Sequence, residues 1–268
     1  MIRLDDVSLL FPGGINALHP MSLEFQTGNF TVLLGSSGAG KSSLMRCLNL
    51  LQRPSTGTIT VEGLGSLNNS RLIRAHRRHT AMIFQQHQLI GRHTAWQNVL
   101  LGRLAFHSTW RSLLPLPRRD QTLALECLER VGLLHKALER VDNLSGGEQQ
   151  RVGIARALVQ QPHLILADEP VASLDPATSH KILNLLKTVC TNDGITAIVS
   201  LHQVELATAY ADRIIALAGG KVVFDGPPEE LTSAKLTSIY RPEAALPAGD
   251  SQKTQAYWAS YNLALMEE

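Results

Sequence analysis

Short apolar runs bounded by glycine and proline dominate the first third of the chain and predict β-strands. Residues 2–10 and 21–25 flank a turn at residues 12–14. In the second of these runs apolar and polar residues alternate, as in a strand with one exposed face, so the two runs predict a half-exposed antiparallel pair. The other elements predicted in this part are strands at residues 31–34, 58–62 and 81–84, a turn at 54–57 and a helix at 44–51.

Residues 86–158 have a different pattern, with helical spacing of apolar positions, many leucines and few β-branched runs. We expect a helical insertion here. It is broken at residues 110–117 and resumes as a helix over residues 121–131.

Strand-like runs return at residues 164–167 and 196–201, with a predicted helix over residues 177–189 between them. This strand–helix–strand alternation predicts parallel strands joined by right-handed crossovers. The remaining predicted elements are a closing hairpin of residues 213–217 and 221–225, a short helix that starts at Pro227 and a peripheral tail past about residue 241.

Charge and composition narrow the class of protein. The 268 residues carry 25 basic and 23 acidic side chains, and a formal net charge of +2 is too balanced to indicate a nucleic-acid partner. The basic run at residues 71–79 is therefore interpreted as the solvated face of a helix. The beginning of the sequence lacks a basic segment followed by an apolar core, and no apolar run reaches the length of a membrane span. We expect neither a signal peptide nor a transmembrane helix.

Three cysteines, Cys47, Cys127 and Cys190, lie far apart and match no metal-binding spacing. Each falls in a predicted helix. They are expected to be buried free thiols of a protein in a reducing cytoplasm.

The sequence from Gly35 to Ser42 fits the P-loop pattern, with an apolar strand before it and a helix after it. Its glycines let backbone N–H groups turn inward toward phosphate oxygens, and the helix N-terminus adds further donors. A glycine-rich turn with a surface lysine would not need this strand and helix, so we predict a nucleoside triphosphate site. Lys41 would contact the β- and γ-phosphates, and Ser42 would bind Mg²⁺. The predicted nucleotide-binding residues of this loop are Gly35, Ser36, Ser37, Gly38, Ala39, Gly40, Lys41, Ser42 and Ser43.

Two acidic residues end the apolar strand at residues 164–167, at the edge where α/β proteins bind their ligands. Asp168 fits the residue that holds Mg²⁺, through water. Glu169 follows directly and is placed to orient or deprotonate the attacking water. An ordinary acidic strand end is the alternative, and the P-loop argues against it.

The segment Leu144-Ser145-Gly146-Gly147 resembles the signature of the ATP-binding-cassette (ABC) transporter ATPases. The order of motifs matches that family over about residues 1–240. The resemblance implies one ABC ATPase domain over residues 1–240, with a tail at 241–268. Its α/β fold would be a P-loop NTPase core of the RecA-like type with an antiparallel β subdomain, over 1–85 and 159–240, and an inserted helical subdomain at 86–158.

The same resemblance implies that ATP is sandwiched between the P-loop of one copy and Ser145, Gly146 and Gly147 of a second copy. Glu148 departs from the family, which usually has glutamine there. Together with Ser145 it forms a capping-box pattern, so capping the helix is an alternative to contacting nucleotide.

Four further positions match the family one by one. Gln85 fits the glutamine that faces Mg²⁺ and water, and His202 fits the switch histidine that contacts the γ-phosphate. Asp175 fits the family's aspartate in the loop that follows the acidic pair Asp168 and Glu169. It also suits a helix N-cap before Pro176. Phe11 stands where an aromatic ring stacks on adenine, with plain core packing as the alternative.

Three stretches resemble the phosphonate-import branch of the family, the PhnC-like ATPases: residues 108–112, which include Trp110, residues 167–176 and residues 192–203. That branch implies a peripheral subunit on the cytoplasmic face of the bacterial inner membrane, bound to integral-membrane permease subunits. A periplasmic or lipoprotein substrate-binding protein would act through the permease, and no nucleic acid is expected. The cargo would be phosphonate, phosphite or hypophosphite, and Trp110 as a core residue of the insertion is the alternative to a role in recognition.

Other functions fit the P-loop less well. They are an ABC ATPase of another importer or exporter, a soluble ABC ATPase acting on nucleic acid or ribosomes, and a P-loop small-molecule kinase. The single cassette with a short insertion argues against the soluble class. The signature and His202 argue against the kinase.

Overall fold

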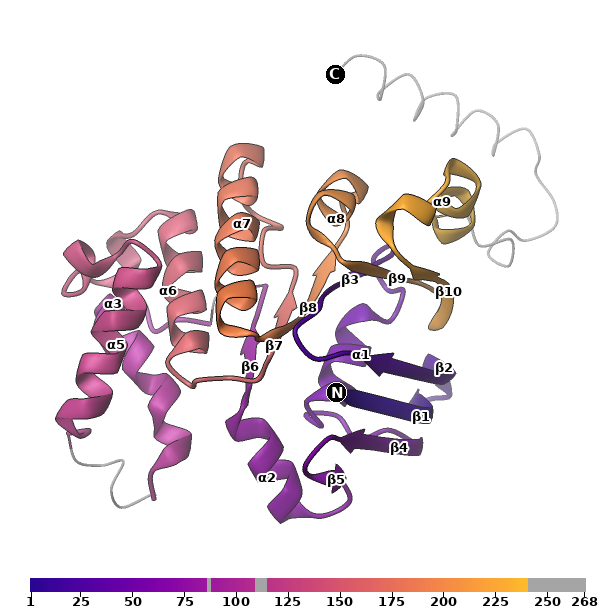
Figure 1. The fold of residues 1–268 in the computed structure, drawn as a ribbon, viewed down its shortest axis with the longest axis horizontal. Helices are drawn as coiled ribbons and strands as arrows, with labels where there is room; N and C mark the ends of the chain where they lie inside the picture. The colour runs from indigo at the N-terminus through magenta and orange to yellow at the C-terminus, as the bar shows by residue number, and fades with distance from the viewer. Residues whose placement is uncertain (86–87, 109–114, 241–268) are drawn as a thin grey trace.

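The computed structural model describes residues 1–85, 88–108 and 115–240, and two β-sheets run through it. One sheet has six strands and the other has four. Figure 1 shows helices on one side of the six-stranded sheet and the four-stranded sheet on its other side, with one helix between the two. Among the described residues no helix is both long enough and apolar enough to cross a membrane. The layers confirm the predicted α/β class.

Five parallel strands and one antiparallel edge strand form the larger sheet, in the order β10-β9-β3-β8-β7-β6. Leu34 pairs with Leu201, and Asp168 pairs with Ser200, so three neighbouring strands end at the same edge. The predicted closing hairpin is confirmed. The strands are β3 (Phe30–Leu34), β6 (Thr80–Ile83), β7 (Leu164–Asp168), β8 (Thr196–Leu201), β9 (Arg213–Ala218) and β10 (Lys221–Gly226).

The smaller sheet is antiparallel and has the order β2-β1-β4-β5. The predicted antiparallel pair is confirmed, but its second strand begins at Ile15 and not at residue 21. Pro20 lies inside this strand, which tolerates a residue without an N–H group because it is at the edge of the sheet. The strands are β1 (Ile2–Phe11), β2 (Ile15–Phe25), β4 (Thr56–Val61) and β5 (Gly65–Ser66).

Two hydrophobic cores lie on the two faces of the six-stranded sheet. Residues along β3 alternate between them: Leu33 packs with α1 (Lys41–Leu48) and the antiparallel sheet, while Val32 and Leu34 pack toward the other face. That other face is covered by α7 (Pro176–Asp193), α8 (Val204–Tyr210) and α9 (Ser233–Tyr240). Because both faces of the sheet are buried, its strands are apolar throughout.

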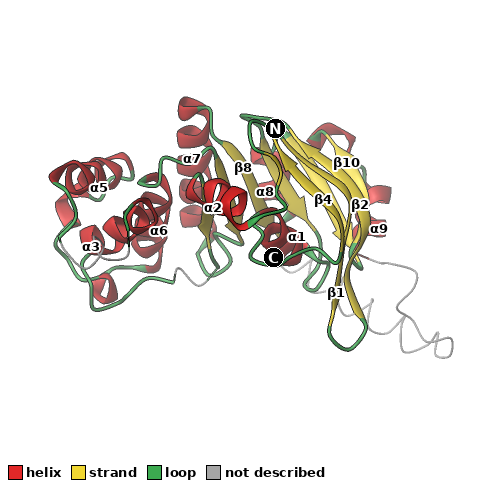
Figure 2. Ribbon diagram, turned by 90° about the horizontal axis from the view of Figure 1, so that it is seen from below, coloured by secondary structure: helices red, strands yellow, loops and turns green. Residues whose placement is uncertain are grey.

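The described helices between β6 and β7 gather at one end of the molecule, as Figure 2 shows. They are α3 (Ala95–Leu100), α5 (Arg118–Arg130), α6 (Gly146–Leu158) and the 3-10 turns Leu101–Phe106, Leu134–Lys136 and Val141–Asn143. The division of the chain at residues 86 and 158 stays a prediction. Trp110 and the tail at 241–268 lie outside the described residues.

Several predicted helix bounds were wrong. The helix expected at 44–51 begins at Lys41 and ends at Leu48, since Leu50 takes a left-handed φ of 50° that an α-helix excludes.

The basic run forms α2 (Ser70–Arg78), but Ile73 and His76 are buried. Arg77 donates to the carbonyls of Asn49 and Leu50, so this helix packs against the end of α1 as well as facing solvent.

The three cysteines are free thiols, each buried in a helix, as predicted. Burial raises the pKa of Cys47 and of Cys127 to about 11 and that of Cys190 to about 12. All three thiols therefore stay protonated at neutral pH, which fits a role in packing.

Candidate nucleotide site

The predicted P-loop, the acidic pair and the histidine meet at one edge of the six-stranded sheet. Strands β3, β8 and β7 are neighbours, and the three groups follow their carboxyl ends. Residues 32–33, 167–168 and 199–200 are therefore at matching heights, and the loops after them lie together. This edge is the ordinary ligand-binding edge of a parallel α/β sheet.

Two glycines of the P-loop have no room for a side chain. Gly35 (φ 151°) faces the Leu217 carbonyl of β9, which a Cβ atom would overlap. A Cβ on Gly40 (φ 105°) would lie 2.8 Å from the Ala17 carbonyl of β2. The loop is thus pressed between the two sheets, and its last residue is the N-cap of α1.

Lys41 is held under the P-loop rather than extended into solvent. Its ammonium donates to the carbonyls of Gly35 (2.7 Å) and Ser36 (3.0 Å), and only 4% of the residue is exposed. Burial lowers the pKa of this lysine, while the nearby carboxylates of Glu169 and Asp168 oppose that shift. The ammonium is thus partly desolvated and donates to two neutral carbonyls, and phosphate oxygens would be stronger, anionic acceptors.

Asp168 is the centre of a hydrogen-bonded group. Its Oδ1 atom accepts from the Ser42 hydroxyl (2.9 Å) and from the Ser200 hydroxyl (2.8 Å). The Ser200 oxygen in turn accepts from the backbone N–H of Glu169 at 2.8 Å. Asp168 and Ser200 are both buried, so the orientation of the carboxylate is fixed.

Glu169 and His202 contact each other across the ends of β7 and β8. His202 Nε2 lies at hydrogen-bond distance from Glu169 Oε1. The other ring nitrogen, Nδ1, lies 3.3 Å from Lys41 Nζ and 3.2 Å from the Gly35 carbonyl oxygen. Glu169 takes a left-handed φ of 48°, which turns its side chain out of the β7 direction toward the histidine.

The signature residues form a second cluster, at the start of α6. Ser145 is the N-cap: its hydroxyl oxygen accepts from the Glu148 N–H at 3.4 Å, and Glu148 Oε2 accepts from the Ser145 N–H at 2.9 Å. The capping box considered for Glu148 is therefore confirmed. Lys136 Nζ lies 2.7 Å from the other carboxylate oxygen of Glu148. The charge of Glu148 is thereby turned onto a lysine and the helix backbone.

Charge and backbone contacts make Glu148 a pH-sensitive part of this cap. The hydrogen bond from Lys136, followed by those from Ser145, lowers the pKa of Glu148 from 4.5 to about 2. A pKa depressed by folding adds stability above its ordinary value and loses it as the pH falls toward the folded value.

We therefore expect Glu148→Gln to flatten the dependence of the free energy of unfolding on pH between about 5 and 3. Urea unfolding at several pH values measures this. Glu139→Gln is the matched control, because Glu139 is more exposed and 3.9 Å from the same lysine. Parallel curves for Glu148→Gln and the unmodified chain would contradict the role of the Lys136 contact.

Asp175 shares a cavity with the signature. It is the N-cap of α7, where its Oδ1 accepts from the Thr178 N–H at 3.0 Å, as predicted. Backbone and side-chain hydrogen bonds from Thr178 lower the pKa of Asp175. A cavity of about 730 Å³ is lined by residues of both segments, including Ser145, Gly146, Gly147 and Asp175. The structure thus brings the predicted signature residues together with Asp175.

Gln85 and Phe11 stand apart from these clusters. Gln85 is exposed and follows β6 by two residues; β6 ends at Ile83, which pairs with Ala167, so Gln85 lies at the edge that bears the acidic pair. Phe11 ends β1, is half-buried and packs against the core of the antiparallel sheet. Its packing fits the alternative considered for it, and adenine stacking stays a prediction.

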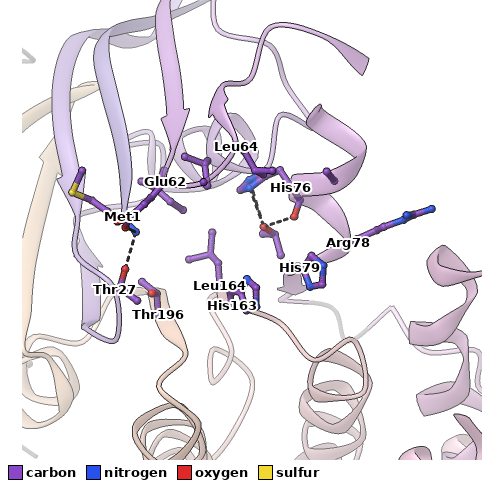
Figure 3. Close-up of a pocket in the computed structure, with 15 residues that line it drawn as sticks. Met1, Thr27, Glu62, Leu64, His76, Arg78, His79, His163, Leu164 and Thr196 are labelled. Atoms are coloured by element: carbon purple, nitrogen blue, oxygen red, sulfur yellow. Dashed lines mark hydrogen bonds and ion pairs between the residues drawn. The ribbon is translucent and has the colours of Figure 1, made fainter. Parts of the chain in front are cut away.

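Another cavity, of about 510 Å³, lies at the opposite edge of the six-stranded sheet (Figure 3). Its lining includes Thr80, Leu164 and Thr196, which are the first residues of β6, β7 and β8. The rings of His79 and His163 stack there with centroids 4.8 Å apart. The P-loop follows β3 at the carboxyl-end edge of the sheet, so this cavity is not part of the predicted nucleotide site.

Sequence reasoning missed Ser200 and Lys136. A hydroxyl in the otherwise apolar run before His202 was a usable signal for Ser200, because a fully buried strand has few polar residues without a partner. For Lys136 no signal existed, since its contact with Glu148 depends on how a 3-10 turn folds back on α6.

Comparisons of the sequence with known proteins identify its family. A family model described as ABC transporter matches residues 18–172. The phosphonates import ATP-binding protein PhnC 3 of Nostoc sp. is 61% identical over 240 residues, which are 90% of this chain and 92% of that protein. The phosphite import ATP-binding protein PxtA of Stutzerimonas stutzeri is 62% identical over 240 residues, which are 90% of this chain and 87% of that protein.

Solved structures of ATP-binding cassettes share the fold. The dimeric post-hydrolysis state of the cassette MJ0796, bound to ADP and Pi, matches with a TM-score of 0.74 and 33% identity, covering 85% of this chain and 99% of that chain. The cbiO1 protein of Clostridium perfringens is part of the ABC transporter complex cbiONQ. It matches with a TM-score of 0.77 and 26% identity, covering 90% of this chain and 96% of that chain. The predicted P-loop NTPase fold of the ABC type is thereby confirmed.

Proposed function

The chain belongs to the ABC transporter ATP-binding proteins, and from that membership we propose that it is the ATP-hydrolysing subunit of an importer for phosphonate or a related reduced phosphorus oxyanion, such as phosphite or hypophosphite. The observation that supports hydrolysis is the continuous contact from Glu169 through His202 to Lys41 under the P-loop. The cargo rests on the relatives named for phosphonate and phosphite import.

The P-loop binds the triphosphate. Backbone N–H groups of residues 35–43 and the N-terminus of α1 surround the phosphates, and Lys41 adds the positive charge. To do so Lys41 exchanges its two carbonyl contacts for phosphate oxygens. This exchange is favourable because a charge-assisted bond to an anion is stronger than a bond to a neutral carbonyl.

Ser42 and Asp168 fit a magnesium ion. They supply only oxygen donors, which Mg²⁺ prefers, and the Ser42 hydroxyl oxygen and Asp168 Oδ1 are already 2.9 Å apart in a partly buried place. Gln85 is the third candidate, at the same edge of the sheet. Among the described residues no group of three or more His, Cys, Asp or Glu side chains is placed to hold a metal. When bound, the ion neutralises charge on the β- and γ-phosphates.

Glu169 accepts a proton from the attacking water. Its backbone is anchored by Ser200, and the contact with His202 keeps the carboxylate facing the P-loop side of the sheet edge. His202 contacts the γ-phosphate from the position beside Lys41. The water oxygen would then bond to the γ-phosphorus as the bond from that phosphorus to the ADP oxygen breaks, so that ADP and phosphate leave.

A second copy of the chain completes each site. Ser145, Gly146 and Gly147 present the N-terminus of α6 to the γ-phosphate bound by the partner's P-loop, and Asp175 lies beside them. The pairing of Glu148 with Lys136 supports this, because an unpaired carboxylate there would repel phosphate. The dimeric MJ0796 structure with ADP and Pi is a precedent for the assembly. ATP favours the closed pair, and hydrolysis removes that preference.

The pair works with integral-membrane permease subunits. Helices of residues 86–158 form the subdomain that, with Gln85 at its start, meets the permease and links its movement to the γ-phosphate. The chain then sits peripherally on the cytoplasmic face of the bacterial inner membrane. A periplasmic or lipoprotein substrate-binding protein selects the cargo and acts through the permease.

The test is ATP hydrolysis by the chain reconstituted with its permease subunits in vesicles. The binding protein is supplied loaded with methylphosphonate, phosphite, hypophosphite or orthophosphate. We expect at least one of the first three to stimulate hydrolysis and orthophosphate to do so less. Stimulation by orthophosphate alone would contradict the cargo, and absence of hydrolysis in every case would contradict the ATPase function.

A further inference from the structure

The last described helix touches the histidine of the nucleotide site. Tyr240 ends α9, and its hydroxyl donates to the backbone carbonyl of His202 at 2.9 Å, across 38 residues of sequence. Figure 1 shows α9 beside β9 and β10. Ile239, the residue before the tyrosine, is fully buried in the core beneath this face of the sheet, so the helix is anchored independently of the hydroxyl.

The carbonyl that accepts this bond lies beyond the sheet. Leu201 is the last residue of β8, and it pairs with Leu34, so the ladder of hydrogen bonds ends just before His202. The imidazole of His202 is fixed at its other end, by Glu169 on Nε2 and by Lys41 and Gly35 around Nδ1. Tyr240 thus supplies a fixed point for the backbone of a residue whose ring reaches across the site.

From these contacts we propose that Tyr240 is a positioning residue for His202, an inference that rests on the ATPase function proposed above. The direction of the imidazole depends on the peptide to which it is attached. With the carbonyl of His202 held by α9, the ring points along the line from Lys41 to Glu169. Without the hydroxyl the turn before α8 relaxes, and fewer molecules hold the histidine in line with the γ-phosphate.

Tyr240→Phe tests this with the least disturbance. The tyrosine is 37% exposed and Ile239 still anchors α9, so the variant is expected to fold, which a thermal melt checks. We expect kcat for ATP hydrolysis to fall about two- to tenfold, the factor that one neutral hydrogen bond gives, with KM for ATP unchanged. KM for ATP is expected to be unchanged in this variant because the phosphates are bound mainly by the P-loop.

Tyr210→Phe is the matched control. Tyr210 ends α8, and its hydroxyl donates to another histidine carbonyl, that of His180, at 3.0 Å. The substitution therefore removes the same kind of bond on the same face of the sheet, away from the P-loop. We expect its kcat to equal that of the unmodified chain, and an equal loss in both variants would overturn the proposal.

The decisive measurement repeats Tyr240→Phe in a His202→Ala background, by single-turnover hydrolysis with enzyme in excess. If Tyr240 acts through the imidazole, its removal has no further effect once the ring is gone. A loss of the same factor in both backgrounds, or no loss in either, would overturn the proposal. Turnover by the unmodified chain in the same assay tests the ATPase function by itself, so the two failures are distinguishable.

Discussion

Glu169→Gln is expected to leave ATP binding intact and to lower ATP turnover by about 10²- to 10⁴-fold, the usual contribution of a general base. The amide has nearly the same shape as the carboxylate and keeps a hydrogen-bond contact with His202, so the site is not distorted. It cannot accept the proton of the attacking water. Steady-state hydrolysis and the binding of a fluorescent ATP analogue measure the two effects separately.

The same variant should accumulate as an ATP-bound dimer, because closure precedes hydrolysis and opening follows it. Gel filtration with and without ATP measures this. Glu205→Gln is the matched control. Glu205 is exposed in the first turn of α8, three residues past His202, so its substitution removes an equal charge near the site. Turnover in Glu169→Gln equal to that of the control would contradict the catalytic role of Glu169.

Strands were predicted more accurately than helices, for a physical reason. β8 was predicted with its observed bounds because a strand buried on both faces is a continuous apolar run. The start of β2 was missed because Pro20 reads as a break, and only its place at the sheet edge permits it. Helix α8 was not predicted. It has seven residues and buries only Leu206 and Ala207, which are too few to show the helical spacing of apolar positions.

The site was predicted where one local segment carries the chemistry. Gly35 to Ser42, Asp168 and Glu169 each follow a strand, and the parallel sheet then brings those strand ends together. Residues that act through a distant partner gave no such signal. The contact between Tyr240 and His202 depends on α9 folding back over the sheet, which no spacing in the sequence specifies.

Lys41→Ala is expected to weaken ATP binding by about 10- to 100-fold, the range that one hydrogen-bonded charge contributes. Burial desolvates the ammonium, which lowers the pKa of Lys41. Only phosphate oxygens compensate the free-energy cost of that desolvation fully. In the absence of nucleotide the alanine variant should therefore unfold with nearly the same free energy as the unmodified chain. Isothermal titration with ATP and urea unfolding without it measure the two quantities.

Lys187→Ala is the control that distinguishes a specific effect of Lys41 from the effect of removing any lysine. Lys187 lies on α7 and is paired with Asp212 at 2.6 Å, near the start of β9 and away from the P-loop. Its removal should cost some stability and leave ATP affinity unchanged, the reverse of the pattern at Lys41. If Lys41→Ala bound ATP as tightly as Lys187→Ala, the cation under the P-loop would serve only to hold the Gly35 and Ser36 carbonyls, and the nucleotide site would have to lie elsewhere.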